Sequence, residues 1–210
     1  MNNIALVYRY VRQNNSFAEV RTELIRKSIH MLIALVPLLA ALTGRGATLA
    51  LLSGGVVFYT YAEILRTRGS SIPFITGLTA AAARPEDLQS KMIVGPITLG
   101  IGAMVSLLMY PHTASIIAIY ALAFGDSVSS IIGRAVGRVH IGPWQHKTLE
   151  GSLACFLVVL FVSFRLTGSL SGSCCIAAAA TILEAIPVRD LDNILMPMGS
   201  GLAACWVLAV

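Results

Sequence analysis

One carboxylate stands inside an apolar stretch of the chain, ALAFGDSVSSIIGRAVGR at residues 121–138. An acid within a membrane-spanning segment is costly and usually faces a polar partner or cavity, so Asp126 is a candidate functional group. Ser130, Gly133 and Gly137 follow at helical offsets, and their small side chains let a ligand or another backbone approach. The alternative is a helix-packing seam of small residues, which leaves Asp126 unexplained.

A charged face comes just before the first long apolar run. In ELIRKSIH, the residues Glu23, Arg26, Lys27 and His30 stand at offsets of 0, 3, 4 and 7, which places them on one face of an α-helix. The alternative is a basic membrane anchor with an intrahelical pair between Glu23 and Lys27. An anchor does not explain His30, which leads into the apolar run.

A glycine-rich loop, GRAVGRVHIGPWQHKTLEGS, carries Arg134, Arg138, Lys147 and Glu150. Glycine-rich backbone presents N–H groups to anions, and Arg and Lys add positive charge, so the loop is suited to a polyphosphate. It is not a P-loop, because GPWQHKT lacks the second glycine of that motif. The alternative is an ordinary basic loop beside the membrane.

A group of hard oxygen donors follows in LEAIPVRDLDNILMP, with Glu184 before the proline and Asp192 and Asn193 after it. Magnesium takes one or two carboxylates together with substrate phosphates and waters, which fits this set. Asp192 could instead cap the helix that follows it. Capping does not require Glu184.

The elements that must position these groups are membrane helices. Hydrophobic residues make up 56% of the chain and charged residues 12%, a composition outside the range of soluble domains. Because about 20 apolar residues cross the hydrocarbon layer, we expect an all-α, polytopic membrane bundle of about seven spans. It forms one domain, 1–210, that begins with a basic cytoplasmic arm, 1–28.

The predicted spans run from Ile29 to Thr43, Gly46 to Leu65, Met92 to Tyr110, Thr113 to Gly133, Ser152 to Gly168, Ser171 to Ile186 and Ile194 to Val210. A count of six is the alternative, because several segments are short. The stretch IPFITGLTAAAA, which contains Pro73, is shorter still and is predicted to be interfacial or re-entrant.

The basic residues divide unevenly between the two sides of these spans. With a cytoplasmic N-terminus, only Arg45 and Arg165 fall on the outer side, as the positive-inside rule favours. The net charge of +5 therefore reflects the basic residues that orient the protein in the membrane, and it does not indicate a nucleic-acid partner. The acids gather on the same side, where a nucleoside triphosphate is available. Carboxylates, cations and a buried acid together predict phosphoryl or nucleotidyl transfer onto a lipid at the cytoplasmic face.

These motifs resemble those of the CTP-dependent lipid alcohol kinases. That family comprises dolichol or polyprenol kinase, phytol kinase and the CTP-using diacylglycerol kinase, and it is related to the phosphatidate cytidylyltransferases. The resemblance rests on E-x-x-R-K-x-x-H from Glu23 to His30, G-D-S-x-[AS]-S-x-x-G-R-x-x-G from Gly125 to Gly137, K-T-x-E-G-S from Lys147 to Ser152, and the acidic pattern from Glu184 to Asn193. It implies transfer of the γ-phosphoryl group of CTP to the hydroxyl of a membrane lipid, with Mg²⁺ or another divalent cation.

The resemblance, combined with charge and position, gives each residue an expected role. The predicted catalytic residues are Asp126, Lys147 and Glu150. The predicted nucleotide-binding residues are Arg26, Lys27, Arg134, Arg138 and Lys147. The predicted metal ligands are Asp126, Glu150, Asp192 and Asn193. Six further residues are expected to complete the site: Glu23, His30, Ser130, Gly133, Gly137 and Glu184. For Asp126, two roles stay open, namely contact with the lipid hydroxyl and contact with the metal.

Two other functions use the same residue types as the kinase. A cytidylyltransferase would use the same CTP and Mg²⁺ to form a CDP-lipid and pyrophosphate. A transporter would use Asp126 and Glu184 as a path for protons or cations. The transporter is disfavoured because the acids cluster toward one face of the membrane and no matching polar residues occur toward the other.

Overall fold

The described part of the chain is helical. A computed structural model describes residues 20–70, 72–82, 92–141, 147–186 and 190–209. Within these ranges the β-pairing is limited to one isolated antiparallel bridge between His140 and Thr148. The all-α prediction is therefore confirmed there. Several residues used for the topology prediction lie outside these ranges, among them Arg9, Arg12, Arg84, Lys91 and Arg189.

The described ranges consist mainly of helices. The first helical segment, Val20–Thr43, includes the 3₁₀ turn η1 (Leu32–Leu35) and α2 (Val36–Thr43). The others are α3 (Arg45–Thr67), α4 (Pro73–Ala82), α6 (Gly95–Met109), α7 (His112–Tyr120), the π-helix η2 (Ala121–Asp126), α8 (Ser127–Val136), α9 (Leu149–Thr167), α10 (Leu170–Ala185) and α11 (Asp192–Leu208). Thr148 and Ser169 cap the N-termini of α9 and α10, and Gly168 ends α9 in the left-handed region.

Each of the seven predicted spans contains a helix, and within the described ranges four helices are long and apolar enough to cross a membrane. These four are Val20–Thr43, Arg45–Thr67, His112–Val136 and Leu149–Thr167. Gly95–Met109 and Leu170–Ala185 are apolar but shorter. The first helix starts before Ile29 because its polar residues are paired inside the bundle, so part of the predicted arm is built into the fold. The short stretch after Ile72 forms α4.

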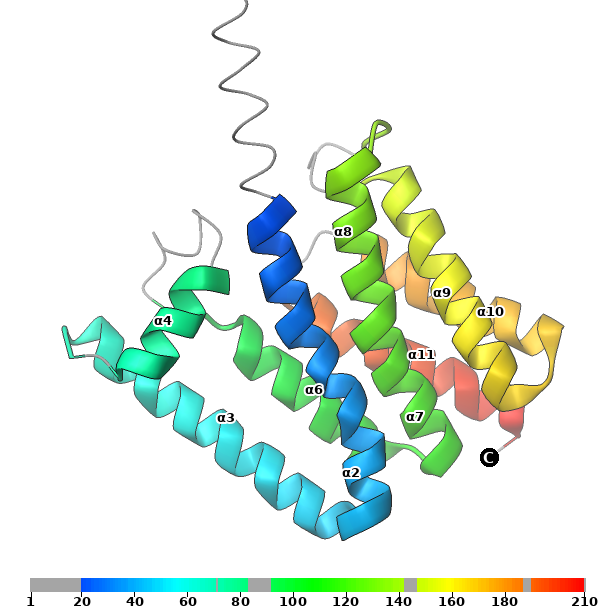
Figure 1. Cartoon of the computed structure of the whole chain (residues 1–210). Helices are drawn as coiled ribbons and strands as arrows, with labels where there is room; N and C mark the ends of the chain where they lie inside the picture. Colours follow the sequence, from blue (N-terminus) through cyan, green and yellow to red (C-terminus); the bar gives the residue numbers. More distant parts are fainter. Residues whose placement is uncertain (1–19, 71, 83–91, 142–146, 187–189, 210) are drawn as a thin grey trace, which may run out of the picture.

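The core lies around α7. Ile117 and Ala118 are fully buried and belong to one apolar cluster with residues of α9, α10 and α11, such as Ile176 and Met196. Gly125 permits this packing, because a Cβ there would lie 2.6 Å from Met196 Cε and 2.8 Å from Val159 Cγ2. The first helix and α8 lie next to each other, with α3 and α4 on one side and α9 and α10 on the other (Figure 1).

The outer surface of the bundle is apolar. Large side chains such as Leu157, Phe161, Leu202 and Trp206 are more than half exposed. Buried charges occur inside the bundle instead, including Glu23, Lys27, Asp126 and Glu184. An apolar exterior around a polar interior is the arrangement that a lipid environment requires. The interior charges form the candidate site.

Candidate active site

Asp126 lies at the end of the π-helix η2, within the continuous helical segment His112–Val136. A π-helical turn is rare and frequently marks a functional site. The carboxylate is 2% exposed, its Oδ2 accepts a hydrogen bond from Lys27 Nζ, and it lies 3.3 Å from His30 Nε2. The structure thus brings the acid of one motif to Lys27 and His30, two residues of the charged face predicted on the first helix.

The charged face of the first helix points into the bundle. Lys27 is 1% exposed and reaches across to Asp126, so it does not form the Glu23–Lys27 pair expected of a basic anchor. Glu23 accepts a hydrogen bond from Arg26 Nη2 at 2.5 Å and pairs with Arg134 Nε of α8 at 3.1 Å. Ion pairs therefore join the first helix to η2 through Lys27 and to α8 through Glu23.

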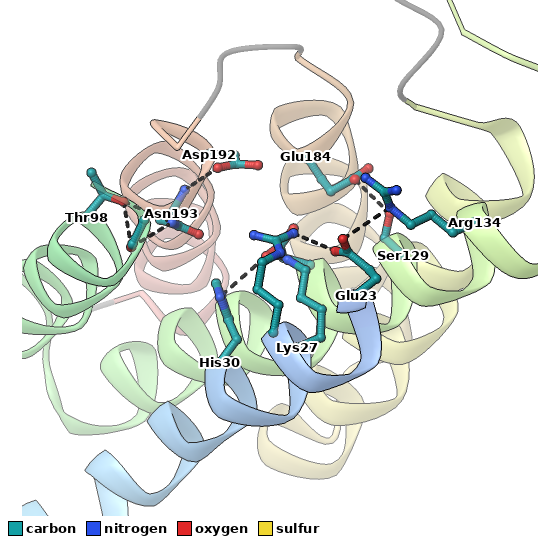
Figure 2. A network of polar contacts seen from close by, with 12 residues as sticks. Glu23, Lys27, His30, Thr98, Ser129, Arg134, Glu184, Asp192 and Asn193 are labelled. Atoms are coloured by element: carbon teal, nitrogen blue, oxygen red, sulfur yellow. Dashed lines mark hydrogen bonds and ion pairs between the residues drawn. The ribbon is translucent and has the colours of Figure 1, made fainter. Parts of the chain in front are cut away.

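A second group of charges centres on Lys147, just before α9. Its Nζ donates to Glu184 Oε1 at 2.5 Å and lies 3.8 Å from Asp192 Oδ2. Glu184 is fully buried and also accepts hydrogen bonds from Ser129 at 2.7 Å and Ser152 at 3.4 Å. Figure 2 shows Glu23, Lys27, Glu184 and Asp192 projecting toward one region between the first helix, α8, α10 and α11.

The two groups of charges interact electrostatically. Burial by itself lowers the pKa of Lys147, but the carboxylates of Glu184, Asp126 and Asp192 outweigh burial and raise it above the usual value. Burial, followed by the charge of Asp126, raises the pKa of Asp192. Asp126 and Asp192 thus repel each other while Lys147 attracts both. The charges of both groups therefore form one electrostatic network.

Asn193 connects α11 to α6. Its Nδ2 donates to Thr98 Oγ1 at 2.9 Å and to the Gly95 carbonyl at 3.4 Å, and the residue is buried. Asp192 Oδ1 accepts the N–H of Asn193 at 3.0 Å, in the first turn of α11. The N-cap of α11 is Leu191 and no described side chain caps that end, so the alternative that Asp192 caps the helix is wrong. Asp192 lies in the first turn and faces Lys147.

Glu150 lies away from these buried charges. Its carboxylate accepts the backbone N–H of Arg138 at 3.0 Å and that of Val139 at 3.3 Å. These contacts join the end of α8 to the start of α9, beside the backbone bonds Ile141 N to Lys147 O and Leu149 N to Val139 O. The structure therefore gives Glu150 a role in shaping the loop that carries Lys147. Arg138 is exposed at the start of the same loop.

The small residues after Asp126 serve a close approach of the backbone. A Cβ at Gly133 would lie 2.9 Å from Thr148 Oγ1, and one at Gly137 would lie 2.6 Å from Thr148 Cγ2. These glycines let α8 pack against the N-terminus of α9, as the packing alternative predicted. Ser130 is half-buried on the same helix.

Three serine and threonine residues of the network were not among the predicted site residues. Ser129 and Ser152 bind the carboxylate of Glu184, and Thr98 binds the amide of Asn193. Ser129 lies in the glycine-rich motif from Gly125 to Gly137 and Ser152 in the motif from Lys147 to Ser152, so these motifs could have indicated both serines as site residues. Choosing among Ser127, Ser129 and Ser130 required knowing which face of α8 meets α10.

The carboxylates of the site are candidate metal ligands. Among the described residues, no group of three or more His, Cys, Asp or Glu side chains is placed to hold an ion by itself. Magnesium needs only one or two carboxylates when phosphate oxygens and waters complete its shell. Asp126 and Asp192, two mutually repelling acids, fit that requirement. The residues therefore fit a magnesium ion only where phosphate oxygens and waters supply the rest of its shell.

Comparisons with known proteins point to one group of enzymes. The chain is 25% identical over 203 residues to "Phytol kinase 1, chloroplastic" of Arabidopsis thaliana, covering 88% of this chain and 66% of that protein. It is also 25% identical to a probable phytol kinase 1 of Oryza sativa subsp. japonica, covering 88% of this chain and 64% of that protein. A probable phytol kinase of Triticum aestivum is 25% identical over 94% of this chain and 72% of that protein. No protein-family model and no solved structure matches the chain. The chain thus spans just under two thirds of the first two relatives and is similar to plant phytol kinases along most of its own length.

Proposed function

We propose that this chain is a lipid alcohol kinase that transfers the γ-phosphoryl group of CTP to the primary hydroxyl of a membrane lipid. The observation that carries the proposal is the convergence of Asp126, Lys27 and Lys147 inside an otherwise apolar bundle. Similarity to proteins named as phytol kinases supports the phosphoryl acceptor class. CTP as donor rests on the motif resemblance.

The reaction forms one bond and breaks another. The lipid hydroxyl oxygen attacks the γ-phosphorus, the bond from that phosphorus to the β,γ-bridging oxygen breaks, and CDP leaves with the bonding electrons. The hydroxyl proton passes to Asp126, which also orients the O–H group. Because the transition state of phosphoryl transfer is loose, positioning and charge neutralisation contribute most of the catalysis.

Cations from three parts of the chain are proposed to bind the triphosphate. Arg26 and Lys27 approach from the first helix, Arg134 and Arg138 from the end of α8, and Lys147 from the loop before α9. Lys27 and Lys147 already neutralise buried acids, so they are held in place before substrate binds. Such preorganised charge acts strongly in a water-poor site.

Magnesium is proposed to bind beside Asp126 and Asp192, with Asn193 positioned by its contacts to α6. When bound, it would neutralise charge on the phosphate oxygens. Glu150 was predicted as a ligand and a catalytic residue. Its contacts with the N–H groups of Arg138 and Val139 support a different role, namely fixing the loop that presents Lys147.

The site is proposed to lie at the cytoplasmic face of a multi-pass protein with its N-terminus in the cytoplasm. The supporting observation is the distribution of basic residues along the sequence. On this orientation the charged end of the first helix meets soluble CTP, while the apolar exterior contacts the bilayer that supplies the acceptor. Phytol-like alcohols, polyprenols and diacylglycerol all present a primary hydroxyl there.

A labelling experiment tests the proposal. Purified protein in lipid micelles is incubated with CTP labelled at the γ-phosphate and a panel of phytol, a polyprenol and diacylglycerol, and a parallel series uses ATP. We expect label in the lipid product. Label recovered only as pyrophosphate would instead establish a cytidylyltransferase, and ion flux in liposomes without nucleotide consumption would establish a transporter.

A further inference from the structure

A mostly apolar pocket lies beside the charged network. Its walls come from the first helix, α3, α4, α6 and the start of α11. Ile93, Pro96 and Leu99 line one wall, and Leu78 of α4 lines another. Leu78 is 44% exposed, so the lining reaches the protein surface at α4. Arg26 and His30 line the same pocket and belong to the charged network.

Two nitrogen atoms of the lining lack hydrogen-bond partners within the described part of the chain. They are Nε of Arg26 and Nε2 of His30, and both atoms are buried. A buried polar atom without a partner is costly, so such atoms commonly await a ligand or water. Arg26 Nε is a donor, and Nε2 of a neutral imidazole carries a hydrogen in one of its two tautomers. The oxygen of one hydroxyl group has two lone pairs and can accept from both nitrogens, which leaves its own hydrogen free to point at Asp126.

The pocket wall is fixed by contacts made elsewhere. Glu63 of α3 is 2% exposed, accepts two hydrogen bonds from Arg66 and accepts the backbone N–H of Ile93 at 2.7 Å. Tyr59, which also lines the pocket, donates to the Ile93 carbonyl at 3.4 Å. These contacts hold the segment before α6 against α3. The pocket is therefore a built feature and not a gap between loosely packed helices.

We infer that this pocket holds the acceptor alcohol, with the hydroxyl at Arg26 and His30 and the first part of the apolar chain between α4 and α6. The inference rests on the proposed kinase function and specifies its acceptor site. His30 Nε2 lies 3.3 Å from Asp126 Oδ2, so a hydroxyl bound at His30 lies next to the proposed reacting centre. Figure 2 shows His30 on the side of the network nearest Asn193 and Thr98. His30 acts as a positioning residue for the hydroxyl.

Filling the pocket provides the first test. Leu99→Trp places an indole among the lining side chains, whereas the matched control Leu157→Trp lies on α9, where the side chain is 54% exposed and outside the pocket. We expect Leu99→Trp to raise the apparent KM for the lipid alcohol at least tenfold and to change that for CTP less than twofold. Leu157→Trp should change neither. An unchanged KM for the alcohol in a folded Leu99→Trp protein overturns the inference.

Photolabelling of the unmodified chain provides a second test that does not depend on a folded variant. A long-chain primary alcohol with a diazirine near its hydroxyl is crosslinked in micelles, and labelled peptides are identified by mass spectrometry. Label on residues 26–30 and 93–99, removed by excess phytol, supports the pocket. Label confined to the outer face of α9 overturns it. If label is confined to α9 but phosphorylated lipid still forms, the pocket is wrong and the kinase proposal holds. If the pocket is labelled but no alcohol is phosphorylated, the kinase proposal is wrong and the pocket still binds an alcohol.

Discussion

Replacing Asp126 by asparagine tests whether this carboxylate has a role beyond neutralising Lys27. Within the described ranges, Asp126 forms the only ion pair of Lys27, and both side chains are almost fully buried. Asp126→Asn leaves a buried ammonium group without its counter-charge. Removing one partner of a buried ion pair destabilises a protein by about 3–5 kcal/mol. For a chain of this size, that corresponds to a fall in Tm of roughly 6–20 °C.

A lower Tm by itself would confuse lost folding with lost catalysis, so the charge is balanced in a second variant. The double variant Lys27→Met with Asp126→Asn removes both charges. Because replacing a whole buried ion pair by neutral groups is often close to neutral in stability, we expect Tm to recover most of its loss. Turnover should stay at least about 100-fold below that of the unmodified protein, since the hydroxyl-orienting carboxylate and a proposed phosphate-binding lysine are both absent.

The measurement is a complete cycle of four proteins: the unmodified chain, each single variant and the double variant. Each is purified in the same detergent, its Tm is read by circular dichroism, and transfer of label from γ-labelled CTP to lipid is measured at a temperature below every Tm. Recovery of activity along with stability in the double variant would refute the reasoning, because Asp126 would then serve only to neutralise Lys27. An unchanged Tm in Asp126→Asn would contradict the buried pair itself.

Three further predictions concern the charges around Lys147. Lys147→Ala should raise the apparent KM for CTP about tenfold or more and leave that for the lipid nearly unchanged, and an equal effect on both would contradict a triphosphate role. Glu150→Gln keeps a carbonyl oxygen that accepts the loop N–H groups, so we expect less than a threefold loss of turnover, whereas a metal ligand would lose far more. Burial and then Asp126 raise the pKa of Asp192, so its ionised form costs stability at neutral pH. Asp192→Asn should therefore raise Tm at pH 7 while lowering turnover, and the gain in Tm should shrink as the pH falls toward 3.8, the usual pKa of the group.

The sequence predicted the helices well because the signals for them are local. Apolar runs bounded by Gly, Pro and charged residues gave seven segments, and each one contains a helix. The face formed by Glu23, Lys27 and His30 followed from helical spacing alone and is present in the structure. The first helix was predicted to begin too late, since hydropathy treats its polar start as an exposed arm. Ion pairs inside the bundle offset the cost of burying the polar residues at the start of this helix.

Which charges meet was decided only by tertiary packing. Lys27 and Asp126 are 99 positions apart, and Lys147 and Glu184 are 37 positions apart, so no local spacing joins them. The sequence alone grouped Glu150 with the metal ligands, but the packing of α8 against α9 directs it to backbone N–H groups. Hydropathy and periodicity describe one helix at a time. The partner of each buried charge depends on how helices distant in the chain pack together.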